Sequence, residues 1–207
     1  YGISEGGKRE LLWHTCGTGR ADIEKAQKII LEGPLHHDAD YLLMALGTLE
    51  EVLAKKSSWR TASQKRELLE LAISSNTRIQ EAVFGCLMHY KGDPDVRNLF
   101  VDILHHHPDA SVRGVMVGRL MVNTEGDLPA MAELRKTLLD PSEFVRVRAA
   151  ESLGRRGDYS GAPVLRVILS TEPATSAEDY RVSKAASAAG DVRHTDLIEP
   201  LQRLVKL

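Results

Sequence analysis

The chain has 207 residues, of which 43% are hydrophobic and 5% aromatic, and its 27 basic and 29 acidic residues give a formal net charge of −2. This balance argues against a protein that holds nucleic acid mainly by neutralising phosphates, because such proteins carry an excess of Lys and Arg. The scarcity of aromatic residues favours helix-on-helix packing over a β-sandwich.

Apolar residues recur at helical spacing along the whole chain and predict six pairs of helices. The first helix of each pair is expected at residues 8–16, 39–55, 76–90, 110–122, 142–155 and 178–188. The second is expected at residues 22–32, 61–73, 95–106, 128–139, 161–169 and 195–206. The Pro-, Ser- and Thr-containing segment 170–179 is typical of an exposed loop.

No such pair can bury its apolar face alone, so the helix pairs are expected to stack in series. The prediction is an all-α solenoid that forms a single domain over residues 1–207. A compact helical bundle is the alternative. Because the first residue is Tyr1 and not Met, we also expect the chain to be a piece of a longer protein.

A Gly-Asp dipeptide recurs at intervals of 34, 31 and 33 residues, which indicates a repeat protein. The four dipeptides are Gly92-Asp93, Gly126-Asp127, Gly157-Asp158 and Gly190-Asp191. Each is interpreted as the turn within a helix pair. The glycine adopts the left-handed conformation that closes the first helix, and the Asp or a polar residue soon after it caps the second.

Residues 140–169 resemble a HEAT repeat of the short bacterial type, which also occurs in phycobilin lyase subunits. The matching residues, in order, are Asp140, Pro141, Val145, Arg146, Ala149, Ala150, Leu153, Gly154, Gly157 and Asp158. The resemblance covers residues 75–207 best and extends to the rest by phase. It implies that the Arg of each Val-Arg dipeptide pairs with an acidic residue of a neighbouring repeat. The ladder expected from this likeness consists of Arg113, Arg146 and Arg181 with Asp109, Asp140 and Asp179.

The same resemblance implies that the second helices line a concave surface, where a partner would bind. With the apolar stripe of each second helix removed, polar residues remain as candidate contacts. They are Arg97, Asp102, His105, His106, Arg135, Lys136, Arg166 and Arg203. The basic members favour a protein or peptide partner with acidic groups. A solvated face without a ligand is the alternative.

The sequence offers no catalytic constellation, and we predict no metal, cofactor or catalytic residue. Three consecutive histidines at 105–107 diverge around a helix and make poor ligands for one metal. The acidic residues of "HHDAD" (36–40) precede a helix, where Asp is an expected cap. The glycines of "CGTG" (16–19) lack the spacing of a phosphate loop.

Three functions follow, in order of preference. The first is a protein-interaction module: a scaffold, adaptor or assembly factor. The second, implied by the resemblance, is a subunit of a bilin-type chromophore lyase or isomerase. The third is nucleic-acid binding, as in HEAT-like DNA glycosylases, although Trp13 and Trp59 lie away from the basic part of the chain.

The location of the protein is predicted from its cysteines and its hydropathy. Cys16 and Cys86 lie in apolar helical patterns and are expected to be buried thiols, as is usual in a reducing compartment. No apolar run approaches the length of a membrane span, and no signal peptide is visible. We therefore expect a cytoplasmic protein that makes no membrane contact.

Overall fold

The computed structural model describes residues 39–55, 60–123, 128–171 and 176–205. Ten α-helices and two short 3-10 helices account for all the regular structure within these ranges, so the all-α prediction is confirmed. The chain divides into two compact units, residues 1–91 and 92–207. The helix pair expected at 8–16 and 22–32 lies outside the described residues, as do Cys16 and residues 36–38.

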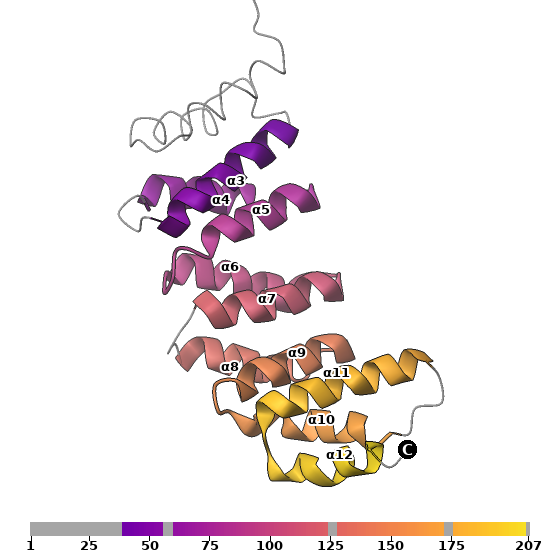
Figure 1. Ribbon diagram of the computed structural model, residues 1–207. Helices are drawn as coiled ribbons and strands as arrows, with labels where there is room; N and C mark the ends of the chain where they lie inside the picture. The colour runs from indigo at the N-terminus through magenta and orange to yellow at the C-terminus, as the bar shows by residue number, and fades with distance from the viewer. Residues whose placement is uncertain (1–38, 56–59, 124–127, 172–175, 206–207) are drawn as a thin grey trace, which may run out of the picture. The chain divides into compact units, whose positions relative to one another are not determined.

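Three helices form the described part of the first unit: α3 (Ala39–Lys55), α4 (Ala62–Leu71) and α5 (Thr77–Leu87). Both α3 and α4 pack against α5 (Figure 1). The start of α4 is fixed by a capping box, in which the side chains of Thr61 and Gln64 each bond to the other's backbone amide. Asn76 caps α5 by accepting hydrogen bonds from two amides of its first turn.

Cys86 belongs to the core of the first unit. Its side chain is fully buried, and its Sγ lies 3.3 Å from the carbonyl oxygen of Leu46. Burial, together with the charge of Glu50, raises the pKa of this thiol to about 12. The expectation of a buried thiol is therefore confirmed for Cys86.

We expect Cys86 in the native protein to resist thiol reagents, because only the thiolate reacts. At pH 8 it should react at least about a thousandfold more slowly than a free cysteine, whose pKa is about 8.5. The measurement is the rate of reaction with Ellman's reagent in a Cys16→Ser variant, before and after denaturation. Rapid labelling of the folded variant would contradict the assignment.

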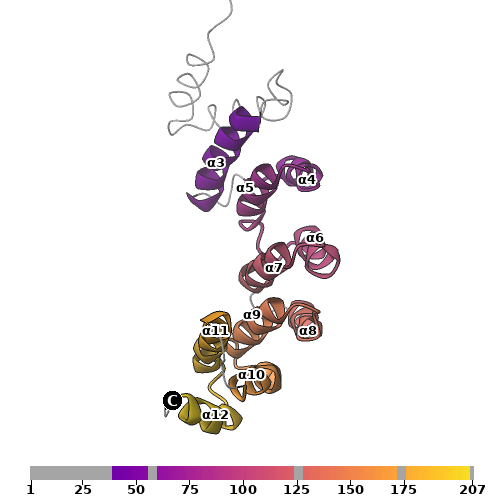
Figure 2. The same cartoon turned by 90° about the vertical axis from the view of Figure 1, so that its right-hand side faces the viewer.

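The second unit contains the remaining helices, which pack in series. The first helices of successive pairs lie side by side, α7 against α9 and α9 against α11, and α6 contacts α8 and α10 contacts α12 (Figures 1 and 2). This is the packing of a helical-repeat solenoid, as predicted. The elements are α6 (Pro94–His106), α7 (Ala110–Asn123), α8 (Leu128–Thr137), α9 (Glu143–Gly154), η2 (Tyr159–Gly161), α10 (Ala162–Leu169), α11 (Ser176–Val192), η3 (Thr195–Leu197) and α12 (Ile198–Leu204).

The apolar stripes predicted from helical spacing form the core of this unit. Val145, Ala149 and Leu153 are fully buried along α9, and Met116 and Leu120 are fully buried along α7. Residues three and four apart share one helix face, so each stripe is continuous. Each first helix is thereby held between its neighbours.

Two of the predicted Gly-Asp turns have the expected geometry. Gly92 and Gly157 adopt φ values of 74° and 75°, the left-handed region that glycine enters without a steric penalty. The following residues, Asp93 and Asp158, accept hydrogen bonds from amides at the start of α6 and of η2. Gly126-Asp127 lies outside the described residues.

The fourth predicted turn, at Gly190-Asp191, is wrong. Helix α11 begins at Ser176, inside the predicted loop, and continues through Gly190 to Val192. The left-handed residue is instead Arg193, with φ 50°. The helix is longer because Val192 is fully buried against Gly154 of α9, so an earlier end would remove an apolar side chain from the core.

Candidate functional site

Arg113 occupies a buried site between two successive helix pairs. Its Nε and Nη2 atoms each lie 2.9 Å from an oxygen of Asp140, and its Nη1 donates to the carbonyls of His107 and Pro108 at 2.8 and 3.0 Å. The two charged side chains are only 10% and 8% exposed. A two-pronged Arg–carboxylate bond of this kind fixes geometry as well as charge.

Arg146 repeats part of this arrangement one helix pair later. Its Nη1 donates to the carbonyls of Asp140 and Pro141 at 2.8 and 3.0 Å, which are again the residues six and five positions before the arginine. Arg113 and Arg146 therefore make the same contact with the loop that precedes their own helix. Position 175, which corresponds to Asp140 in the next pair, is Thr in this sequence.

The other residues expected in the ladder differ in their contacts. Arg181 pairs with Glu143 of α9, with Nη1 and Oε2 3.0 Å apart. Asp109 caps α7 by accepting a hydrogen bond from the amide of Ser111. The side chain of Asp179 lies outside the described residues.

Asp140 meets both arginines, Arg113 through its carboxylate and Arg146 through its backbone carbonyl oxygen. Burial alone would raise its pKa, but the hydrogen bonds from Arg113 and from the amide of Ser142 outweigh burial and hold the pKa below its usual value. The ionised form is thus the one that the fold favours.

Most of the candidate contact residues on α6 and α8 already pair with other side chains of this chain. His105 of α6 lies 2.9 Å from Glu133 of α8, which also accepts a hydrogen bond from Lys136 at 2.8 Å. The bond from Lys136 is the main reason that the pKa of Glu133 is lowered. His106 pairs with Asp102 one turn earlier on the exposed face of α6.

Arg135 of α8 is likewise neutralised within the protein. Its Nη2 lies 2.6 Å from Oδ2 of Asp158, the residue that also caps η2. Burial would raise the pKa of Asp158, but hydrogen bonds from Ser160 and Arg135 lower it overall. Arg97 of α6 is half-buried and also has an interaction partner.

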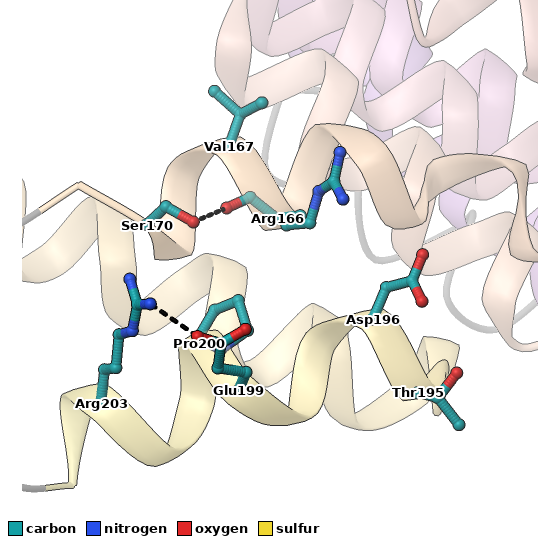
Figure 3. Close-up of a pocket in the computed structure, with 8 residues that line it drawn as sticks. All are labelled: Arg166, Val167, Ser170, Thr195, Asp196, Glu199, Pro200 and Arg203. Atoms are coloured by element: carbon teal, nitrogen blue, oxygen red, sulfur yellow. Dashed lines mark hydrogen bonds and ion pairs between the residues drawn. The ribbon is translucent and has the colours of Figure 1, made fainter.

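A groove with a volume of about 640 Å³ lies between α10 and the segment formed by η3 and α12 (Figure 3). It brings together the last two candidate residues, Arg166 and Arg203, from different helices. Sequence spacing alone did not identify the rest of its lining, because η3 sets the positions of Thr195 and Asp196. The lining consists of Arg166, Val167, Ser170, Thr195, Asp196, Glu199, Pro200 and Arg203.

The two arginines of the groove differ in their surroundings. Arg203 pairs with Glu199 at 2.6 Å, and both side chains are largely exposed. The guanidinium of Arg166 makes no hydrogen bond or ion pair with any residue that the structure describes. Ser170 contacts only the backbone of Arg166, through a 2.8 Å bond to its carbonyl oxygen.

Within the described residues, no group of three His, Cys, Asp or Glu side chains is placed to hold a metal ion. None of the described helices has the length and apolar character needed to cross a membrane.

No protein-family model matches the chain, and no curated protein sequence does. Among solved structures, the chain is similar to the crystal structure of an engineered protein that was a target of the Northeast Structural Genomics Consortium. That similarity has a TM-score of 0.45 and 17% sequence identity, and it covers 89% of each chain.

Proposed function

We propose that this chain is a protein-interaction module built of HEAT-like repeats, and that it binds an acidic side chain of a partner protein in the groove between α10 and α12. The observation that carries the proposal is the guanidinium of Arg166, which faces this groove without a partner among the described residues. An arginine of this kind can form a two-pronged bond to a carboxylate.

The other basic candidate residues differ in how readily they could bind a partner. Lys136 and Arg135 already bond to acidic residues of this chain, so a ligand would have to displace those bonds. Arg203 is more available, since its bond to Glu199 joins two exposed side chains and such pairs contribute little stability. The groove therefore offers a ligand one unpaired arginine, Arg166, and a second, Arg203, whose bond to Glu199 the ligand can replace.

The acidic residues of the groove limit the partner. Asp196 and Glu199 stand beside the two arginines, so the formal charge of the lining is close to zero. A polyanion would place several charges against these carboxylates, whereas a single carboxylate flanked by neutral residues would not. The proposal is accordingly a peptide segment with an isolated acidic residue. The chromophore-lyase and nucleic-acid alternatives stay predictions from the sequence.

The test uses a short peptide whose only charged side chain is one glutamate, and the same peptide with glutamine in place of that glutamate. By NMR titration, we expect the glutamate peptide to bind at least about tenfold more tightly, because a charge-assisted hydrogen bond is worth about 1.5–3 kcal/mol. Arg166→Gln should abolish this difference. Glu199→Gln should tighten binding, since it releases Arg203 and removes a repelling charge.

Arg148→Gln is the matched control, because it removes an exposed arginine from a different surface of the same unit. It should leave the difference between the two peptides unchanged. The proposal fails if the two peptides bind equally well to the unaltered protein, or if Arg166→Gln has no more effect than the control.

A further inference from the structure

The first helices of the second unit carry exposed apolar side chains that their own packing does not cover. Val115 on α7, Phe144 on α9 and Tyr180 on α11 are 41%, 52% and 65% exposed. Each helix has a pair of exposed residues four positions apart, at 111 and 115, at 144 and 148, and at 180 and 184, and residues at this spacing share one helix face. We refer to these three side chains as the apolar row.

The contacts between helices place the members of the row next to one another. Phe144 packs over Gly114, where an added methyl group would collide with the ring, and Gly114 is the neighbour of Val115. The Arg181–Glu143 ion pair joins the residues adjacent to Tyr180 and Phe144. The row therefore crosses three neighbouring helices, with Val115 about one turn further along its helix than Phe144, because Val115 and Arg148 each lie two residues after an arginine that makes the same loop contact.

Basic residues follow two members of the apolar row one helical turn later. Arg148 and Lys184 lie four residues after Phe144 and Tyr180, on the same helix faces, and both are exposed. Lys184 has its Nζ 5.2 Å from the centre of the Tyr180 ring. Arg148 makes only a loose 3.7 Å contact with Glu151. The side chain of Arg148 is nearly half exposed, so it can exchange this weak contact for another carboxylate.

We infer that the apolar row and the two basic residues beside it form a second docking surface, which binds an acidic amphipathic helix of a partner protein. Neighbouring helix axes stand about 8–10 Å apart, and a helix advances about 10 Å in seven residues. A helix of about 15 residues lying across α7, α9 and α11 would thus present apolar residues seven apart to successive members of the apolar row. Acidic residues beside them would meet Arg148 and Lys184.

The observations favour a protein helix over an anionic lipid surface, which would also meet apolar and basic groups. Membrane attachment of this kind depends on apolar side chains that enter the acyl boundary. Phe144 is instead half covered by its packing on Gly114, and Val115 is more than half buried. The apolar area that these two side chains leave exposed is therefore small and suits contact with the side of a helix.

The experiment uses synthetic helical peptides of about 18 residues with leucine at every seventh position and glutamate beside each leucine. Fluorescence anisotropy should show binding to the unaltered protein. The double variant Arg148→Glu/Lys184→Glu should weaken it at least about tenfold, and Tyr180→Ser should weaken it without lowering the unfolding temperature appreciably. A peptide with lysine in place of glutamate should regain binding to the double variant.

Arg166→Glu/Arg203→Glu makes the same change of charge in the α10–α12 groove and should leave peptide binding unchanged. The two surfaces are thereby tested separately, so failure of one does not imply failure of the other. The inference is overturned if no peptide binds the unaltered protein, or if the two double variants lose affinity equally. Binding to phosphatidylserine-containing vesicles that is lost in Arg148→Glu/Lys184→Glu, without binding of the peptides, would also overturn it in favour of a membrane.

Discussion

Replacing Asp140 with alanine should lower the free energy of unfolding by about 3–5 kcal/mol, the usual cost of removing one partner of a buried ion pair. The guanidinium of Arg113 is nine-tenths buried and donates two hydrogen bonds to this carboxylate, which balances its charge. Without it, a charged group would stay in the interior with only the carbonyls of His107 and Pro108. Guanidinium chloride unfolding measures the effect.

Two further variants separate the charge from the rest of the contact. Arg113→Met alone should also be costly, because it leaves the Asp140 carboxylate buried with only the amide of Ser142, but added to Asp140→Ala it removes the unpaired guanidinium and keeps most of the side-chain volume. The double variant should therefore be more stable than Asp140→Ala alone. Equal stability of Asp140→Ala and the unaltered protein would show that Arg113 reaches water and that the pair does not hold the two helix pairs together.

The sign of the change in stability with pH follows from the lowered pKa of Asp140. Because the pKa of Asp140 is held below its unfolded value, its contribution is fully present above that unfolded value and is lost as the pH falls through the folded one. Acidification should thus destabilise the unaltered protein more steeply than Asp140→Ala. Unfolding curves recorded from neutral pH down to about pH 3 would show the two stabilities converging.

Two glycine-to-alanine changes should have opposite effects, although both glycines lie in helices. A Cβ on Gly154 would stand 2.6–2.9 Å from side-chain and backbone atoms of Val192, so Gly154→Ala should force α9 and α11 apart and cost about 1–3 kcal/mol. A Cβ on Gly190 would meet nothing within 4 Å. Gly190→Ala should stabilise α11 by about 0.5–1 kcal/mol.

Thermal unfolding distinguishes these outcomes, because about 1 kcal/mol shifts the midpoint by about 2–4 °C in a chain of this size. Gly190→Ala is the matched control for Gly154→Ala, since the chemical change is the same. It also tests the end of α11 itself. If Gly190 closed the helix in the left-handed conformation, alanine there would destabilise the protein instead.

The sequence predicted the helices well because their signals are local. Apolar stripes such as Val145, Ala149 and Leu153 recur at the helical period, and Asp93 and Asp158 act as caps next to their glycines. The end of α11 could not be predicted in this way. Whether a helix passes through Gly190 depends on a non-local contact, the burial of Val192 against Gly154.

The candidate surface was harder to predict, because the sequence shows which residues are polar but not which are already paired. Arg135 and Arg166 look alike in the pattern of their helices. Only the structure shows that the first meets Asp158, from a turn 23 residues later, while the second faces a groove. The exposure of Phe144 and Tyr180 was equally hidden, since an apolar residue in the first turns of a helix looks the same in the sequence whether it is buried or exposed.

The contacts of Arg113 and Arg146 with the carbonyls six and five residues earlier have a consequence for how such a chain can lengthen or shorten. These arginine-to-carbonyl bonds form within about seven consecutive residues, so a duplicated segment would contain both the arginine and the carbonyls that it binds. The Arg113–Asp140 bond, by contrast, spans 27 residues and requires a matching neighbour. A helix pair could thus be inserted or deleted while each remaining loop keeps its own arginine contact. The bonds between helix pairs would have to evolve again at each new junction.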